Sequence, residues 1–241
     1  MRKFNFLNIM ADNDEVEIRI SGEIMSNGDK EMYEKYWDLK DGESPDTFRA
    51  KLKENEGKPI KLYVDSVGGD VFAASSMYTS LLEYKNNVTA IVSGVAASAA
   101  SFLIMAANKI VIAPTAQIMI HNPMTVAVGD QREMRHTADV LDSIKESIIN
   151  AYEKKTGKSR EEISELMDKE TWMDAHHAVD MGFADEILET NEETSEEVIS
   201  NIFNLRKMVF NKAFKKPEPI KKVKDDIAQK AISEFDFYAN N

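Results

Sequence analysis

The chain has 241 residues and a formal net charge of −12 at pH 7. This length can bury a substantial core and favours one main domain, while the acidic balance argues against a nucleic-acid-binding or membrane-surface protein. The absence of cysteine excludes thiol catalysis, disulfides and thiolate metal sites, and it fits a reducing, cytoplasmic setting. No window approaches ~18 uninterrupted apolar residues, so we expect no membrane-spanning helix. The first ten residues match a signal peptide poorly.

The first part of the chain predicts one strand and two helices. Apolar and polar residues alternate over 16–20, which is the pattern of a half-buried strand, and Ser21-Gly22 would end it. We expect one helix around Met32 to Trp37. A second helix would start at Pro45, with Ser44 as its N-cap, and stop by residue 57.

From residue 60 onward, strands and helices alternate. Such alternation predicts an α/β protein with a parallel sheet and right-handed crossovers. The expected strands cover 60–64, 88–92, 109–112 and 117–120, the expected helices cover 71–84 and 97–107, and Gly68-Gly69 and Gly94 are expected turns.

One long helix is expected from Asp130 to Lys155, because its apolar residues recur every three or four positions and Gly157 follows its basic last turn. It is longer than a small core needs. Ser159 and Asp174 are the expected N-caps of two shorter helices, and 185–188 would form a final strand.

The end of the chain differs in composition. Residues 201–241 hold nine Lys or Arg against five Asp or Glu, so this part carries +4 while residues 1–200 carry −16. We therefore divide the chain into an N-terminal segment (1–14), a main domain (15–189) and an amphipathic, basic C-terminal extension (190–241). The apolar stripe of the extension would pack on the core or on a neighbouring subunit, and its basic residues would bind an acidic partner such as a scaffold protein. The apolar residues 4–10 would either line a pore, dock a partner or fray.

A serine stands in a run of very small residues. Ser98 falls at the expected start of a helix within residues 94–102, where free backbone N–H groups favour developing negative charge. Ala99 follows it and can offer its N–H to an oxyanion. Gly68-Gly69 occupies the equivalent corner one unit earlier, where glycine lets a substrate carbonyl approach the backbone. The pattern thus predicts that Ser98 is the nucleophile of a serine hydrolase and not merely the cap of a helix.

His121 follows the expected strand 117–120, and Asn122-Pro123 turns the chain there. An imidazole with an ordinary pKa near ~6.5 suits a general base at neutral pH. We expect His136 to face solvent. His176 and His177 are adjacent and therefore point apart, so no metal site is expected.

These motifs together resemble the proteolytic subunit of the Clp protease. The segments that carry the resemblance are Asp65-Ser66-Val67-Gly68-Gly69, Gly94 through Phe102 around Ser98, and Met119-Ile120-His121-Asn122-Pro123. The resemblance covers roughly residues 15–188. It implies a crotonase-like spiral of β-β-α units, a protruding handle helix over 130–155, and homo-oligomeric rings. It also implies Ser98 as nucleophile, His121 as base, and the N–H groups of Gly69 and Ala99 as an oxyanion hole beside Gly68.

The third member of the triad has two candidates. Alignment on Ala175, Val179 and Gly182 puts Glu170 where the family has Asp, and the extra methylene displaces the carboxylate by about 1.5 Å. Asp168 is the alternative acid. The Glu170-Thr171-Trp172 form, the extra helices before residue 58 and the extension are similar to the Clp-related proteases among bacteriophage head genes, which process capsid or scaffold proteins.

The leading hypothesis is a serine endopeptidase that acts on protein or peptide substrates without a cofactor. Because the sequence has no nucleotide-binding loop, any ATP dependence would come from a separate AAA+ unfoldase. Two alternatives stay open: a crotonase-type acyl-CoA enzyme, whose enolate would use the same two corners, and a ring-forming assembly protein with a decayed site.

Overall fold

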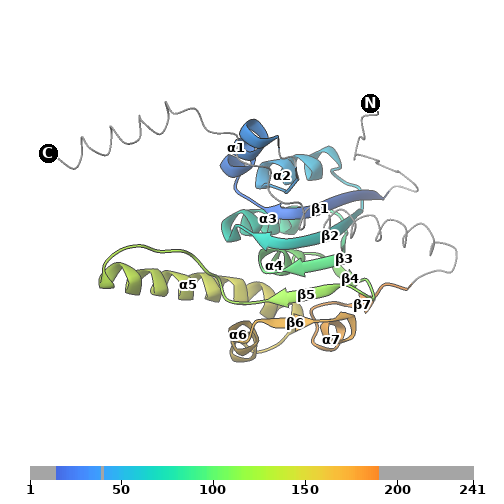
Figure 1. Ribbon diagram of the computed structural model, residues 1–241. Helices are drawn as coiled ribbons and strands as arrows, with labels where there is room; N and C mark the ends of the chain where they lie inside the picture. The colour runs from blue at the N-terminus through green and yellow to red at the C-terminus, as the bar shows by residue number, and fades with distance from the viewer. Residues whose placement is uncertain (1–14, 39–40, 190–241) are drawn as a thin grey trace, which may run out of the picture. The chain divides into compact units, whose positions relative to one another are not determined.

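The computed structural model describes residues 15–38 and 41–189 as a mixed α/β fold (Figure 1), which confirms the predicted fold class. The predictions for residues 1–14 and 190–241 lie outside the described residues. No helix within the described ranges is long and apolar enough to cross a membrane. The strands are β1 (Val16–Ile24), β2 (Ile60–Gly69), β3 (Val88–Ala97), β4 (Lys109–Ile112), β5 (Gln117–Ile120), β6 (Thr171–Met173) and β7 (Glu186–Ile187). The helices are α1 (Asn27–Trp37), α2 (Pro45–Glu54), α3 (Val71–Glu83), α4 (Ala99–Ile104), α5 (Gln131–Thr156), α6 (Arg160–Asp168) and α7 (Ala175–Asp180).

The sheet branches at β3. Its main path runs β1-β2-β3-β4-β7 with parallel pairing throughout. The first half of β3 pairs with β4 over 89–92, and its second half pairs with β5 over 95–97. The strand therefore continues through Gly94, where the sequence predicted a turn. Glycine is needed there because an added Cβ would collide with the Asp65 carboxylate.

The core lies between the sheet and the helices that cover it. Helix α3 packs against α2 and α4, and α4 packs against β2. Apolar side chains of alternating strand positions fill this space, as a half-buried sheet requires. The largest fully buried side chains include Phe48, Leu62, Met77, Leu103, Ile110, Tyr152 and Phe183.

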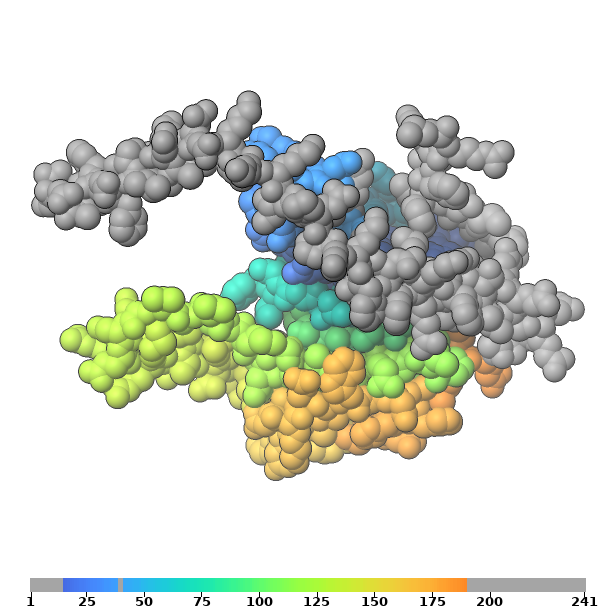
Figure 2. Space-filling model, viewed as in Figure 1, coloured from blue at the N-terminus to red at the C-terminus, as the bar shows by residue number. Residues whose placement is uncertain are grey.

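Helix α5 is the predicted handle. The Asp130 carboxylate caps its first turn, and Gly157, with φ 70°, ends it in the left-handed conformation that favours glycine. Its buried residues all lie in its second half, at 148–152. The first half extends away from the sheet as an exposed arm, drawn in yellow-green in Figures 1 and 2.

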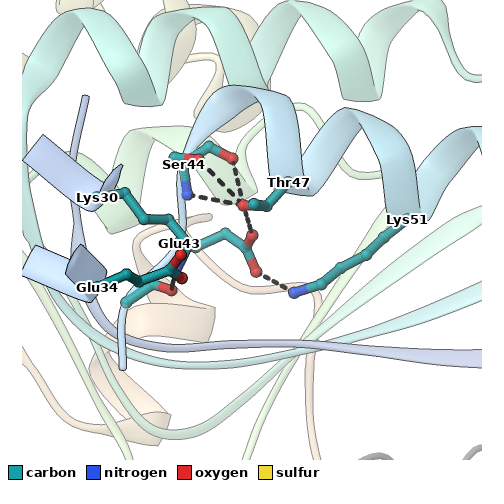
Figure 3. A network of polar contacts seen from close by, with 7 residues as sticks. Lys30, Glu34, Glu43, Ser44, Thr47 and Lys51 are labelled. Atoms are coloured by element: carbon teal, nitrogen blue, oxygen red, sulfur yellow. Dashed lines mark hydrogen bonds and ion pairs between the residues drawn. The ribbon is translucent and has the colours of Figure 1, made fainter. Parts of the chain in front are cut away.

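The segment between α1 and α2 is fastened to the end of β1. The Glu43 N–H donates to the Glu23 carbonyl (2.9 Å), and the Met25 N–H donates to the Glu43 carbonyl (3.0 Å). The Glu43 side chain is buried and contacts Lys51 and Thr47 of α2 (Figure 3). Pairing with β2 carries β1 to Ile24, four residues beyond the predicted strand, and the Glu43 contacts lie on the other side of this end.

Candidate active site

Ser98 stands at the corner between β3 and α4. Its backbone has φ 54° and ψ −123°, and its N–H donates to the Met119 carbonyl (2.9 Å). A positive φ is costly for a residue other than glycine and persists only where surrounding contacts hold it. Nucleophiles of other hydrolases occupy similarly strained strand-to-helix turns, which expose their hydroxyl group.

The sheet brings His121 to this corner. Strands β3 and β5 are paired, with Ala97 opposite Met119, so the residues that follow each strand emerge side by side. The His121 Nε2 atom lies 2.8 Å from the Ser98 Oγ atom, which is hydrogen-bond distance. The imidazole is largely enclosed, with 13% of its surface exposed. The two residues that the sequence singled out are thus in contact.

The glycine pair also reaches this corner, although it ends β2 instead of forming the predicted separate turn. Gly68 and Gly69 have φ values of 92° and 142°. A Cβ at Gly68 would lie 2.7 Å from the Ala99 nitrogen, so only glycine allows this approach. The Gly68 N–H donates to the Ser66 hydroxyl at 3.1 Å and is therefore occupied. The Ala99 N–H opens α4 and has no acceptor within that helix.

Glu170 lies beside the histidine because β6 pairs with β5, an antiparallel strand that the sequence analysis missed. Ile120 pairs with Thr171 at the end of this ladder, so the residues that flank the pair, His121 and Glu170, lie close together. The His121 Nδ1 and Glu170 Oε2 atoms are 4.0 Å apart, which is longer than a hydrogen bond. The other carboxylate oxygen accepts a hydrogen bond from Trp172 Nε1 (3.2 Å).

Asp168, the alternative acid, is bound to other groups. Its Oδ1 atom accepts hydrogen bonds from Lys145 Nζ (2.6 Å) and Asn122 Nδ2 (2.8 Å). These two hydrogen bonds hold the pKa of the Asp168 carboxyl below its usual value, and the bond from Lys145 has the larger effect. No ion pair joins Asp168 to His121 within the described part of the chain.

Residues 50–191 match the Clp protease family, over more than half of the chain. The chain belongs to the Clp protease family. It is 30% identical over 154 residues to the ATP-dependent Clp protease proteolytic subunits of two Bacteroides fragilis strains, ATCC 25285 and YCH46. The match covers 61% of this chain and 74% and 70% of those proteins. Members of the Clp protease family are serine-type peptidases that form oligomeric rings and act on proteins.

A cleft of about 420 Å³ opens over the Ser98 hydroxyl in this Clp-family chain. Gly69, His121 and Glu170 line it, and Glu23 of β1 forms part of its wall. Such a volume is typical of sites that enclose a small ligand or part of a peptide. The cleft can therefore present a bound carbonyl to the Ser98 hydroxyl and the backbone N–H groups together.

Two buried hydroxyl groups, of Ser101 and Tyr152, form a hydrogen-bonded chain that ends at the Ser98 carbonyl. Ser101 Oγ donates to the Ser98 carbonyl (2.6 Å) and is 2.7 Å from the Tyr152 hydroxyl. Because the serine has one proton and gives it to the carbonyl, Tyr152 must be the donor in the second bond. Both side chains are buried, and burial raises the pKa of Tyr152. Sequence reasoning missed this contact, since Ser101 and Tyr152 are 51 positions apart.

The remaining histidines lie away from the site. His136, His176 and His177 are exposed on α5 and α7. Among the residues that the structure describes, no group of three His, Cys, Asp or Glu side chains could hold a metal ion.

Proposed function

We propose that this Clp-family protein is a serine endopeptidase in which Ser98 is the nucleophile and His121 the general base. The observation that carries the proposal is the 2.8 Å contact between Ser98 Oγ and His121 Nε2, at a strained corner that faces a cleft. A hydroxyl is a weak nucleophile until a neighbouring base accepts its proton, and this geometry is the one that such activation requires.

The reaction follows from the positions of these groups. Neutral His121 accepts the Ser98 proton at Nε2 as the oxygen attacks the peptide carbonyl, and it then gives that proton to the leaving amine. The resulting acyl-enzyme is hydrolysed by water that His121 activates in the same way. The N–H groups of Gly69 and Ala99 stabilise the negative charge on the carbonyl oxygen.

Glu170 is the acid that we assign to orient His121. It faces Nδ1 through the ladder of β5 and β6, whereas Asp168 is engaged by Lys145 and Asn122. The 4.0 Å gap shortens when substrate closes the site, because catalytic hydrogen bonds are often long without substrate. The Trp172 indole leaves only one carboxylate oxygen of Glu170 to turn toward the imidazole.

A fluorophosphonate probe tests the nucleophile directly. We expect the wild-type protein to be labelled and Ser98→Ala to lose labelling, with Ser147→Ala, an exposed serine on α5, as the matched control that keeps it. Equal labelling of wild type and Ser98→Ala would refute the assignment of Ser98. Failure of the wild type both to label and to cleave casein would favour the assembly protein with a decayed site.

Two further variants test the acid. We expect Glu170→Gln to lower kcat/KM about 10²-fold, less than the ~10⁴-fold seen for a buried triad acid, because Glu170 is 59% exposed. Asp168→Asn should retain kcat/KM within about threefold, since its partners are not catalytic. The reverse order of these two effects would move the acid's role to Asp168.

Capsid or scaffold proteins are the substrates that we propose, on the resemblance of the Glu170-Thr171-Trp172 form to the phage proteases. Such substrates would be cleaved without a separate ATPase. The Bacteroides relatives are named as ATP-dependent, so the comparison is casein cleavage by the purified chain alone and with an added AAA+ unfoldase and ATP. Cleavage only in the second mixture would favour an unfoldase-dependent subunit.

A further inference from the structure

The acidic side chain of Glu23 lies across the glycine corner of the cleft. Residues 23 and 24 of β1 pair with Gly68 and Gly69, and the Asp70 N–H donates to the Ile24 carbonyl (2.8 Å). A Cβ at Gly69 would lie 2.9 Å from Glu23 Cγ, so the glutamate side chain packs directly over that glycine. Glu23 is therefore part of the cleft that contains Ser98 and His121.

The backbone that carries Glu23 is held on both sides. On one side it pairs with β2, and on the other its carbonyl accepts from the Glu43 N–H. Glu43 is itself anchored, because its buried carboxylate contacts Lys51 and Thr47 (Figure 3). So constrained a strand gives the base of the Glu23 side chain a defined position beside bound substrate, which favours selectivity.

The Glu23 carboxylate has no basic partner among the described residues. No hydrogen bond or ion pair to it occurs within residues 15–38 and 41–189, whereas Glu17 and Glu43 each pair with a basic residue. The charged side chains that line the cleft are Glu23 and Glu170, and no lysine or arginine of the described chain lines it. The cleft thus presents uncompensated negative charge beside the nucleophile, which attracts a cationic ligand.

We propose that Glu23 determines specificity by binding a lysine or arginine side chain of the substrate close to the scissile bond. This inference rests on the proposed peptidase function and adds a substrate preference to it. A basic residue would supply the missing counter-charge, while an acidic residue there would be repelled by both carboxylates. The pairing is partly exposed to solvent, so its effect is a preference of a few-fold instead of an absolute requirement.

Matched peptides test the preference. A fluorogenic peptide is made in matched versions with Lys, Gln or Glu at each position in turn, so that the set does not depend on a known cleavage site. At one or more positions we expect kcat/KM to be about two- to fivefold higher for Lys than for Gln, and lower still for Glu. The preference should shrink when NaCl rises from about 50 to about 500 mM, because salt screens such pairs.

Two substitutions assign the preference to one residue. Glu23→Gln should bring the Lys-to-Gln ratio to about one, and Glu23→Lys should favour the Glu peptide. Glu31→Gln and Glu31→Lys change the same charge on an exposed face of α1 and should leave both activity and ratio unchanged. A wild-type ratio of one at every position, or a preference that survives Glu23→Gln, would overturn the proposal.

Binding separates this inference from the catalytic proposal. The same peptides, carrying a fluorophore, are titrated with the Ser98→Ala protein and with Ser98→Ala/Glu23→Gln while anisotropy is followed. A Kd ratio that favours Lys and depends on Glu23 supports the preference even if wild type cleaves nothing, in which case only the peptidase proposal fails. Cleavage with no such ratio in either assay means that only the preference is wrong.

Discussion

The hydroxyl chain under Ser98 makes a sharp prediction about stability. Ser101→Ala removes the donor to the Ser98 carbonyl and leaves the buried Tyr152 hydroxyl without its acceptor. A lost hydrogen bond costs about 1 kcal/mol and an unsatisfied buried hydroxyl about 1–3 kcal/mol, so we expect a loss of ~2–4 kcal/mol. Tyr152→Phe removes only the terminal donor, and Ser101 can still donate to the carbonyl. That variant should lose only ~1 kcal/mol.

The double variant completes this prediction. Ser101→Ala/Tyr152→Phe has no stranded hydroxyl, so it should be more stable than Ser101→Ala alone. Urea unfolding of the full-length chain, followed by tryptophan fluorescence at one fixed protein concentration, gives the free energies of unfolding. A Tyr152→Phe variant that loses as much as Ser101→Ala, or a double variant that is the least stable of the three, would refute the donor order.

Three other predictions concern single residues. Trp172→Phe should lower kcat/KM severalfold relative to wild type, because Glu170 loses the indole that restrains it; an unchanged kcat/KM would count against this role. Gly69→Ala should abolish probe labelling and folding, since the added Cβ would collide with the Ile24 carbonyl. At Gly57 an added Cβ would meet no atom, so Gly57→Ala should lower the free energy of unfolding by only about 1 kcal/mol, because of the positive φ there. Folding lowers the pKa of Asp168 from 3.8. The contacts of its carboxylate therefore contribute fully to stability above pH 3.8, and this contribution is lost as the pH falls through the lowered pKa. The urea midpoint of Asp168→Asn should therefore lie below that of wild type near pH 7 and approach it near pH 3, and a gap that stays constant would contradict the ion pair.

Local sequence patterns were sufficient for most of the elements. The bounds of β4 and β5 match the prediction, and α5 begins one residue after Asp130, its predicted first residue. Period and capping are local properties, so they can be read without knowledge of the sheet. The two glycine turns were wrong because each glycine allows close approach to a distant segment: Gly94 to Asp65 of β2 and Gly68 to Ala99 at the start of α4. Such contacts join residues about 30 positions apart.

The residues of the site differ in how far the sequence alone could predict them. Ser98, His121 and the glycine corner carried signals in their neighbours, and the structure brings them together. The choice between Glu170 and Asp168 depended on β6, a strand of three residues that is too short to show a period. The roles of Tyr152 and Glu23 depend on tertiary contacts alone, so composition and spacing gave no indication of them.

The branching of β3 has a consequence for engineering. Ser98 and His121 follow two strands that are joined by only three residue pairs, and the Ser98 N–H is bonded to the end of the second strand. Main-chain hydrogen bonds thus set the distance between the nucleophile and the base, which hardly depends on the side chains around these two residues. Another wall of the cleft is formed by Glu23 of β1, a strand that contributes nothing to that ladder. A library that randomises this wall can therefore search for new substrate preferences while the reactive pair keeps its geometry.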